Sequence, residues 1–461
     1  MKHPVSTEAT WGENPPAFGH DMLSEFDLAD GYLNVNQGSY GSTPRRVREA
    51  TQSLVLQIEA NPDLWFRTGM TAPGAEPTVL TLLERSRAAL AAYVNAATED
   101  LAFVDNASHG ISAVLRSMAS YLTSSKKPRV LRLDLAYGEV QSALDTLDFS
   151  DPVYEVDTTD LLAARAAASV TTEDKTAAAD FDAALVARVT DALDASGDVG
   201  FAVFSHITSV PALVLPVAEL AAACRARGVL VLIDGAHAPG QIPLDVPGIG
   251  ADFYVGNGHK HLFTSRGAAF LWTRPSAQPL VHPLVIDTLG DAGDFSPYER
   301  AFNYQGTTDD PTRYIAAVEA LEWRAWISNG TDAAIMDHNS ALARRACEML
   351  AAAWNTTSLG QSPGDAPYAL CNVQLPCDVV GRPACPDDLA GALFRRFNFY
   401  APIFPIQGLG SWMRLTAQVY LDIDDFSIVA AAVLDALSTE QSASGADSTL
   451  AAAAAAAAAT V

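Results

Sequence analysis

The feature that most constrains the fold is the alternation, up to residue 272, of short apolar segments with amphipathic ones. The apolar segments are rich in β-branched and aromatic residues: Leu101–Val104, Arg129–Leu133, Val153–Val156, Phe201–Phe204, Val229–Ile233, Phe253–Val255 and Ala268–Trp272. Helical periodicity lies between them, in Gly110–Leu122, Glu139–Leu147, Phe181–Leu193 and Val217–Arg227. Nearly continuous hydrophobicity indicates strands buried on both faces, and alternation with helices is typical of a parallel sheet. The sequence therefore predicts an α/β fold with a mostly parallel, seven-stranded sheet.

The pattern changes near Pro311, where long helices and shorter strands follow: Tyr314–Trp326, Asp337–Trp354, Tyr368–Leu375 and Trp412–Val419. We expect a large domain over 18–310 and a smaller α+β domain over 311–437. Residues 1–17 are polar and predict a flexible arm, whereas 438–461 end in an alanine run and predict a low-complexity tail. The Ala- and Thr-rich stretch 163–179 predicts a surface loop or a variable helix.

The charge balance restricts the partners of this chain. Lys+Arg 29 against Asp+Glu 54 gives a net charge of −25, which disfavours binding to nucleic acids and to anionic membranes. No apolar stretch approaches the ~20 residues that cross a bilayer, and no apolar signal region follows Met1. The five cysteines are an odd number and form no Cys-x-x-Cys pair; they are Cys224, Cys347, Cys371, Cys377 and Cys385. We therefore expect a reduced, cytoplasmic chain without disulfides or a zinc site.

Two polar segments follow neighbouring strands of the predicted sheet. Asp234-Gly-Ala-His237 comes directly after one strand, and Gly256-Asn-Gly-His-Lys260 follows the next. Ligands in such sheets bind outside the carboxyl ends of the strands, so Asp234 and Lys260 are expected to share a crevice. A lysine that forms a Schiff base and an aspartate that supports a pyridinium nitrogen are the minimum equipment for pyridoxal phosphate. The spacing around Lys260 does not match a P-loop, and no Gly-x-Gly-x-x-Gly follows the first strand.

A third segment, Asp105-Asn-Ala-Ser108-His-Gly110, connects a strand to a helix. Backbone N–H groups at the start of a helix, together with the Ser108 hydroxyl, form a site suited to an anion such as phosphate. An ordinary helix cap made by Ser108 is the alternative interpretation.

Taken together, these segments resemble class V of the pyridoxal-phosphate aminotransferase superfamily (fold type I), over about residues 18–430. The resemblance is to the branch of plant-type L-cysteine desulfhydrases and isopenicillin N epimerases, with fungal ergothioneine-forming C–S lyases nearby. Eight motifs in the family's order carry it: Asn36-Gln-Gly-Ser-Tyr-Gly41, Val104-Asp-Asn-Ala-Ser108, Ala136-Tyr-Gly138, Ser205-His-Ile-Thr-Ser-Val-Pro211, Asp234-Gly-Ala-His237, Asn257-Gly-His-Lys260, Gln305-Gly-Thr-Thr-Asp309 and Arg414-Leu-Thr-Ala-Gln-Val-Tyr420.

The resemblance implies roles around the ring of pyridoxal 5'-phosphate. Lys260 would form the Schiff base and then shuttle protons, and Asp234 would pair with the pyridine nitrogen. His237 would lie near the 3-oxygen or the phosphate. Thr208 would hydrogen-bond the 3-oxygen, and Tyr137 would stack on the ring.

The resemblance also implies a phosphate site and a shared active site. Ala107, Ser108 and Asn257 would hold the phosphate, and Thr307 would reach it from the neighbouring subunit of a homodimer. His259 precedes the lysine as it does in the family, and it is counted among the cofactor-binding residues.

For the substrate, the resemblance implies that Arg414 binds the carboxylate, because a planar fork of donors suits that group. Asn36 and Tyr40 would line the same pocket. Two positions depart from the family: Gln37 stands where a histidine is frequent, and His261 stands after the lysine where the branch frequently has a tryptophan.

The expected reaction is β-elimination on cysteine or a cysteine-derived amino acid, which gives a sulfide or thiol-type product, pyruvate and ammonia. None of the cysteines lies in a mobile loop like the one with which cysteine desulfurases form a persulfide. The alternatives are an epimerase like isopenicillin N epimerase, a cysteine sulfoxide lyase of the ergothioneine type, and a class V aminotransferase. A non-catalytic scaffold is disfavoured because Lys260, Asp234 and Arg414 are all present.

Overall fold

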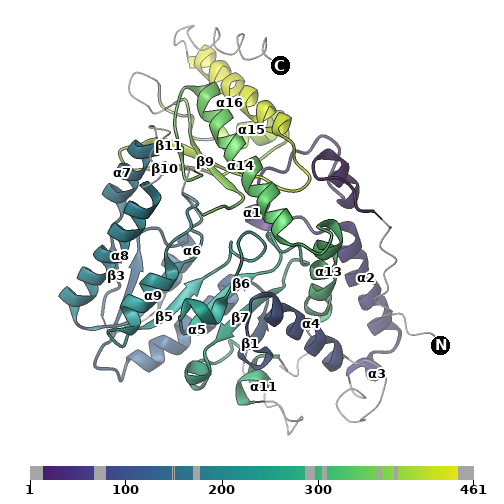
Figure 1. Cartoon of the computed structure of the whole chain (residues 1–461), viewed down its shortest axis with the longest axis vertical. Coiled ribbons are helices and arrows are strands. Elements are labelled where there is room, and N and C mark those ends of the chain that lie inside the picture. The colour runs from purple at the N-terminus through teal and green to yellow at the C-terminus, as the bar shows by residue number, and fades with distance from the viewer. Residues whose placement is uncertain are drawn as a thin grey trace.

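The computed structural model describes residues 14–66, 79–147, 149, 151–169, 177–285, 296–303, 309–361, 366–377 and 383–444. Two sheets organise these residues, a larger one below and a smaller one above in the view of Figure 1. The expected arm at 1–17 is described only from Asn14 onward, and the alanine run of the expected tail lies outside the described residues.

The larger sheet has seven strands in the order β1-β7-β6-β5-β4-β2-β3. They are β1 (Leu101–Val104), β2 (Arg129–Leu133), β3 (Tyr154–Val156), β4 (Val199–Ser205), β5 (Leu230–Asp234), β6 (Phe253–Asn257) and β7 (Ala269–Thr273). The pairs β2–β3, β2–β4, β4–β5 and β5–β6 are parallel, whereas β7 runs antiparallel to both β6 and β1. The prediction of a mostly parallel seven-stranded sheet is confirmed.

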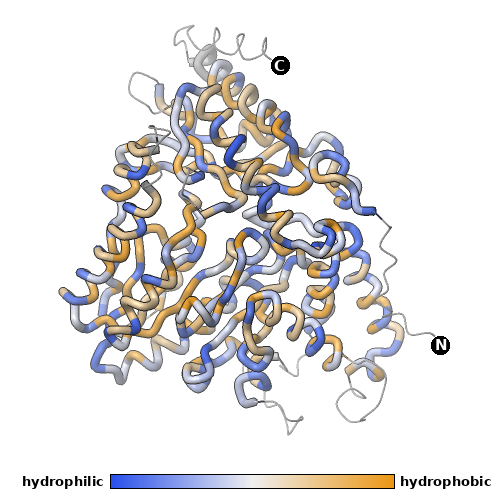
Figure 2. The backbone as a smooth tube through the Cα atoms, in the orientation of Figure 1, coloured by the Kyte–Doolittle hydropathy of each residue, from blue (hydrophilic) through white to orange (hydrophobic). Residues whose placement is uncertain are grey.

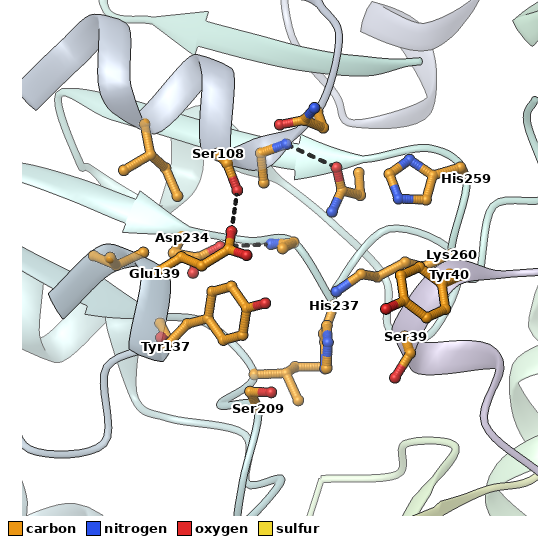
Figure 3. A pocket seen from close by; sticks show the side chains of 18 of the residues that line it. Ser39, Tyr40, Ser108, Tyr137, Glu139, Ser209, Asp234, His237, His259 and Lys260 are labelled. Atoms are coloured by element: carbon orange, nitrogen blue, oxygen red, sulfur yellow. Dashed lines mark hydrogen bonds between the residues drawn. The ribbon is translucent and has the colours of Figure 1, made fainter. Parts of the chain in front are cut away.

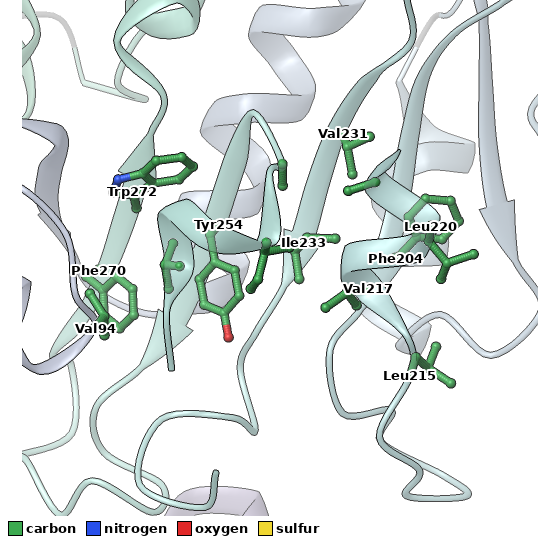
Figure 4. Packing of buried hydrophobic residues seen from close by; sticks show 14 of the residues in the cluster. Val94, Phe204, Leu215, Val217, Leu220, Val231, Ile233, Tyr254, Phe270 and Trp272 are labelled. Atoms are coloured by element: carbon green, nitrogen blue, oxygen red, sulfur yellow. The ribbon is translucent and has the colours of Figure 1, made fainter. Parts of the chain in front are cut away.

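Successive side chains of each strand point to opposite faces of this sheet, and both faces are covered. In β5, Val231 and Ile233 pack with Leu220 of α9 (Val217–Arg225; Figure 4), whereas Leu232 packs on the other face with Ile111 of α5 (Ala107–Leu122). Hydrophobic residues follow the central strands in Figure 2, as expected for strands with no solvated face. The helices of this part are α4 (Val79–Tyr93), α5 (Ala107–Leu122), α6 (Gly138–Thr146), α7 (Thr159–Ser169), α8 (Ala177–Ser196), α9 (Val217–Arg225), α10 (Val246–Ile249) and α11 (Pro297–Asn303).

The smaller sheet is antiparallel, with the strand order β10-β11-β9-β8. Its strands are β8 (Ser358–Leu359), β9 (Leu370–Gln374), β10 (Ile403–Ile406) and β11 (Gly410–Thr416). The helices of this part are α12 (Thr312–Ile315), α13 (Ala317–Ile327), α14 (Ala333–Trp354), α15 (Leu389–Phe397) and α16 (Ile423–Ser444). The helix expected over 314–326 is therefore two helices, and α16 continues past residue 438, where the tail was expected to begin.

The N-terminal elements join this second core. They are η1 (His20–Glu25), α1 (Gln37–Tyr40), α2 (Arg45–Ala60) and α3 (Pro62–Phe66). Met22, Phe26 and Val35 pack in the same hydrophobic cluster as Leu415 of β11 and Phe426 of α16. The first and last parts of the chain therefore share one core, and this places α1 beside the strand that carries Arg414.

The cysteine prediction is wrong for four of the five residues. Disulfides join Cys347 to Cys371 and Cys377 to Cys385, with Cα–Cα distances of 5.6 and 5.0 Å, and Cys224 is a buried free thiol. Cys347 lies on α14 and Cys371 on β9, so the packing of that helix across the sheet brings together residues 24 positions apart. The cysteine pattern therefore gives no support for a reduced environment. Among the described residues, no helix is long and apolar enough to cross a membrane.

Candidate active site

A pocket of about 350 Å³ lies at the carboxyl ends of β4, β5 and β6, between the start of α5, the start of α6 and helix α1 (Figure 3). Nine of the predicted site residues line it: Tyr40, Ala107, Ser108, Tyr137, Asp234, His237, Asn257, His259 and Lys260. Asn36, Thr208 and Arg414 are not in the lining, and Thr307 lies outside the described residues. The structure therefore brings nine of the thirteen predicted residues together in one pocket.

Asp234 reaches the pocket because it ends β5, a central strand of the sheet. Its Oδ1 accepts a hydrogen bond from the backbone N–H of Ala236 at 3.0 Å, which orients the carboxylate, and the residue is only 5% exposed. Burial raises the pKa of Asp234, while the Ala236 amide and the charge of Lys260 act in the opposite direction. A cationic ring nitrogen would supply the charge that this buried carboxylate needs.

Lys260 follows β6, which is paired in parallel with β5, so its side chain enters the same pocket as Asp234. Figure 3 shows its amine pointing into the pocket, across from Tyr137 and Glu139. Burial and the charge of Arg414 lower the pKa of Lys260 to about 7, and Asp234 opposes this shift. A neutral amine is therefore present near neutral pH, as nucleophilic and basic catalysis by lysine require.

Two histidines in the pocket have ring atoms without a partner. The Nδ1 atoms of His237 and His259 are buried and have no hydrogen-bond partner among the described residues. Burial lowers the pKa of His237 well below its ordinary value and that of His259 to about 4, so both rings are neutral. Because buried polar atoms are rarely left unpaired in proteins, these atoms fit a bound polar ligand.

The start of α5 has the chemistry of an anion site. Asn106 caps the helix by accepting from the backbone N–H of His109 at 2.9 Å, and the N–H of Ala107 donates to Asn257 Oδ1 at 2.9 Å. The N–H groups of this first turn and the Ser108 hydroxyl are donors at the positive end of the helix dipole, although the Ala107 N–H and the Ser108 hydroxyl now donate to Asn257 and Glu139. Together with the partnerless histidines and the aspartate, this donor set fits the phosphate and ring of pyridoxal phosphate.

Glu139 is a pocket residue that the sequence did not single out. The Ser108 hydroxyl donates to its Oε2 at 2.8 Å, and it lies beside Tyr137 (Figure 3). Glu139 is in the first turn of α6, and an acidic residue there is also what helix-dipole stabilisation favours, so the sequence signal was ambiguous. Burial raises the pKa of Tyr137, and the neighbouring Glu139 raises it further.

Arg414 lies behind the pocket wall. One end of its guanidinium donates to the carbonyl oxygen and the hydroxyl of Ser209 at 2.9 and 3.3 Å, and the other end donates to Asn36 Oδ1 and Ser39 Oγ, both at 3.2 Å. Ser39 and Ser209 line the pocket, and neither was predicted. Arg414 is 2% exposed, and no described carboxylate pairs with it. Burial lowers its pKa to about 10.

Thr208 does not reach the pocket. Its hydroxyl donates to the carbonyl of Pro211 and accepts from the backbone N–H of Leu213 at 2.9 Å. The hydroxyl is thus used to hold the turn that contains the cis Val210–Pro211 peptide bond. Its position gives no support to a contact with the cofactor's 3-oxygen, and Ser209 of the same turn lines the pocket instead.

Comparison with known proteins places these features in context. Residues 162–378 match the family described as aminotransferase class-V. A protein of Oryza sativa subsp. japonica named "Putative L-cysteine desulfhydrase 1" is 34% identical over 380 residues, which are 79% of this chain and 70% of the relative. The L-cysteine desulfhydrase of Arabidopsis thaliana is 25% identical over 449 residues, 92% of each chain.

Other similar proteins differ in activity or are known as structures. The isopenicillin N epimerase of Streptomyces clavuligerus is 30% identical over 249 residues, 51% of this chain and 60% of the epimerase. A solved structure of a C-DES lysine-to-alanine mutant, with glycine covalently linked to its PLP cofactor, has a TM-score of 0.68 at 19% identity. It covers 89% of this chain and 98% of its own, which shows a shared fold.

Proposed function

Since the chain belongs to the class-V aminotransferase family of pyridoxal-phosphate enzymes, we propose that it is a C–S lyase that eliminates the β-substituent of cysteine or a cysteine-derived amino acid. The observation that carries this proposal is the convergence of Lys260 and Asp234 in one pocket at the ends of neighbouring strands. The relatives named desulfhydrase match most of the chain, whereas the epimerase matches about half of it. With cysteine and water as reactants, the products would be hydrogen sulfide, pyruvate and ammonia.

The cofactor of this enzyme is pyridoxal 5'-phosphate, which when bound withdraws electrons from the substrate and makes its Cα proton acidic. We assign its phosphate to the first N–H groups of α5, Ser108 and Asn257, and its ring nitrogen to Asp234. Tyr137 would pack against the ring, and the partnerless nitrogen of His237 would bind a ring oxygen. On binding, the phosphate oxygens would replace Asn257 and Glu139 as the acceptors of the Ala107 N–H and the Ser108 hydroxyl.

The proton transfers are assigned to Lys260. Its amine has a pKa of about 7, so it can take the Cα proton and return a proton later in the cycle. Lys260 and Tyr137 line opposite sides of the pocket in which the cofactor and the substrate would lie (Figure 3). The substrate carboxylate is assigned to the wall formed by Ser39 and Ser209, where Arg414 supplies an uncompensated positive charge.

The test is to incubate the purified protein with L-cysteine and to measure sulfide and pyruvate. Equal amounts of both are expected from the wild-type protein, and none from Lys260→Ala, which should also lose the visible absorbance of the bound cofactor. Release of sulfide without pyruvate, or no reaction with any cysteine derivative, would refute the proposal.

One observation favours epimerisation as a second candidate. Reprotonation on the opposite face of a substrate needs a second acid, and the Glu139 carboxylate lies across the pocket from Lys260 (Figure 3). Glu139→Gln distinguishes the two functions, because it should abolish epimerisation but leave sulfide release from cysteine within a few-fold of the wild-type rate.

We also propose a cytoplasmic homodimer in which Thr307 of one subunit reaches the phosphate of the other. Support comes from the family's pattern at Gln305–Asp309, of which only Asp309 is described. Light scattering of the purified protein tests the assembly, and a monomer with full activity would refute it.

A further inference from the structure

The chain segment that carries Lys260 is enclosed by two loops that touch it backbone to backbone. Gly41, at φ 70°, comes so close that a Cβ atom would lie 1.8 Å from the carbonyl oxygen of His259. Gly240, at φ 85°, makes a similar approach to the next part of the segment, where a Cβ atom would be 2.3 Å from the carbonyl oxygen of His261. Only glycine allows these approaches, so the fold fixes the two loops directly against the lysine segment.

Two buried side chains hold the consecutive carbonyls of this segment. Gln37 Nε2 donates to the carbonyl oxygen of Lys260, and Arg324 Nη1 donates to that of His261, each at 2.7 Å. Neither side chain lines the pocket, and they are 0% and 1% exposed. The Gln37 amide is held in turn, since its Oε1 accepts from the Ser42 N–H at 2.9 Å and from the Tyr420 hydroxyl at 3.0 Å.

Arg324 connects the lysine segment to the loop that follows Asp234. Its Nη2 donates to the carbonyl of Gly240 at 3.2 Å, and its Nε donates to Asp332 Oδ1 at 2.7 Å. Asp332 also accepts from the hydroxyl of Tyr93 at 2.8 Å, so both oxygens of the carboxylate are used. The guanidinium lies 5.7 Å from the ring of Phe263, whose φ of 68° is rare for a residue with a side chain. Such strained backbone persists only where its surroundings hold it.

We propose that Gln37 and Arg324 are positioning residues, which fix the backbone of Lys260 so that its amine is held inside the pocket. The inference rests on the proposed function of Lys260 and extends it to residues outside the pocket. A lysine side chain is long and flexible, so the place of its amine depends on the backbone from which the side chain extends. Because a displacement of 1 Å far from the chemistry can cost about 100-fold in rate, such anchoring is a catalytic requirement.

The chain offers a matched control for each residue. Arg87 is 2% exposed and makes the same kinds of bond, with Nη2 donating to Glu299 at 2.8 Å and Nη1 to the Thr98 carbonyl at 2.7 Å. Gln374 is only partly buried but makes the same bond as Gln37, its Nε2 donating to the carbonyl of Leu409 at 2.7 Å. Neither control residue lines the pocket. Arg324→Lys and Arg87→Lys keep the positive charge of the side chain. Gln37→Met and Gln374→Met replace the side-chain amide with an apolar group.

The experiment uses the full chain and reads the Lys260 amine directly. Acetic anhydride labels the cofactor-free protein over a range of pH, and peptide mass spectrometry measures the acetylation of Lys260. In the wild-type protein the midpoint of labelling is expected near pH 7, in line with the pKa of Lys260. Arg324→Lys and Gln37→Met should raise this midpoint by about one pH unit, because a displaced amine reaches solvent. Both should also lower kcat about 10- to 100-fold with a smaller change in KM.

The control variants distinguish a role in positioning Lys260 from a role in the stability of the fold alone. Arg87→Lys and Gln374→Met should lower the melting temperature without changing the labelling midpoint or kcat. The proposal is overturned if Arg324→Lys and Gln37→Met behave like their controls. Should Arg324→Lys fail to fold, the comparison of Gln37→Met with Gln374→Met decides the question. Labelling needs neither cofactor nor substrate, so it stays decisive even if the protein turns out not to release sulfide.

Discussion

Near the segment that carries Lys260, two buried arginines, Arg324 and Arg414, have opposite electrostatic surroundings. Burial alone would lower the pKa of Arg324, but Tyr93 and Asp332 outweigh it, so that the pKa is raised. Arg414 is equally buried and donates only to neutral oxygens, and burial lowers its pKa to about 10. The comparison shows that burial by itself does not indicate function. A compensated cation holds the fold together, whereas an uncompensated cation beside a cavity is available to an incoming carboxylate.

The largest expected effect is on the compensated arginine. Arg324→Met should lower the free energy of unfolding by about 3–5 kcal/mol, because it leaves Asp332 and two backbone carbonyls without their partner. Urea unfolding followed by circular dichroism measures this, with Arg87→Met as a second compensated arginine. A loss below about 1 kcal/mol would show that Arg324 is not the structural cation described above.

The uncompensated arginine should respond in the opposite way. Arg414→Met is expected to leave the free energy of unfolding unchanged or to raise it, since it removes a buried charge that has no ionic partner among the described residues. The same substitution should lower kcat/KM about 100-fold, because the positive charge behind the wall of Ser39 and Ser209, which attracts the substrate carboxylate, is lost. The expectation on stability is tested by urea unfolding and the expectation on kcat/KM by steady-state kinetics, both on one preparation. If Arg414→Met destabilises the protein as much as Arg324→Met does, the two arginines do not differ in charge compensation as described.

Lys260 is a second basic residue whose positive charge is poorly compensated, and the dependence of stability on pH should reveal this. Its folded pKa of about 7 lies below the ordinary value of 10.5, so between these values the unfolded chain binds a proton that the folded chain does not. The stability of the cofactor-free protein should therefore rise with pH across this window. Lys260→Met should melt higher by on the order of a few degrees at pH 7 and below, with the advantage shrinking toward pH 10.5. A difference that is constant with pH contradicts the lowered pKa.

The smallest effect is expected from the neutral partners of Arg414. Ser209→Ala removes one hydroxyl acceptor at 3.3 Å, which is worth about 1 kcal/mol, or about fivefold in KM with little change in kcat. Ser39→Ala should behave in the same way, because its hydroxyl accepts from the other end of the guanidinium. Enzyme kinetics with cysteine measures both. A loss of 100-fold from either serine would place the substrate carboxylate on the serine rather than on Arg414.

The sequence predicted the sheet well because its central strands have no solvated face. The expected bounds of β1 and β2 coincide with those observed, and the ends of β5 and β6 place Asp234 and Lys260 as expected. Residues whose role depends on a turn were harder to place. The Thr208 hydroxyl is used by its own turn, and Ser209 lines the pocket in its place. Which of these two side chains faces the pocket depends on backbone angles that residue types do not specify.

The disulfide between Cys347 and Cys371 and the pocket residue Glu139 were missed for a related reason. Cys347 meets Cys371 only because α14 packs across β9, and no local spacing predicts that contact. Glu139 is by its sequence an ordinary acidic residue in the first turn of a helix, and only the fold places it beside Ser108. In both cases the signal is a contact between separate elements rather than a pattern within one segment, whereas Cys377 and Cys385 are only 8 positions apart.

What the sequence determined by itself is the set of groups at the carboxyl ends of the parallel strands, because strand periodicity and the residues that follow each strand are local properties that a buried sheet makes easy to read. What only the tertiary structure decided is which buried cation is compensated. Arg324 and Arg414 are the same residue type, and their difference arises from the carboxylate that the packing of α13 and α14 brings to one of them and not to the other. Charge compensation depends on distances in space, and these are set only when the whole chain has folded.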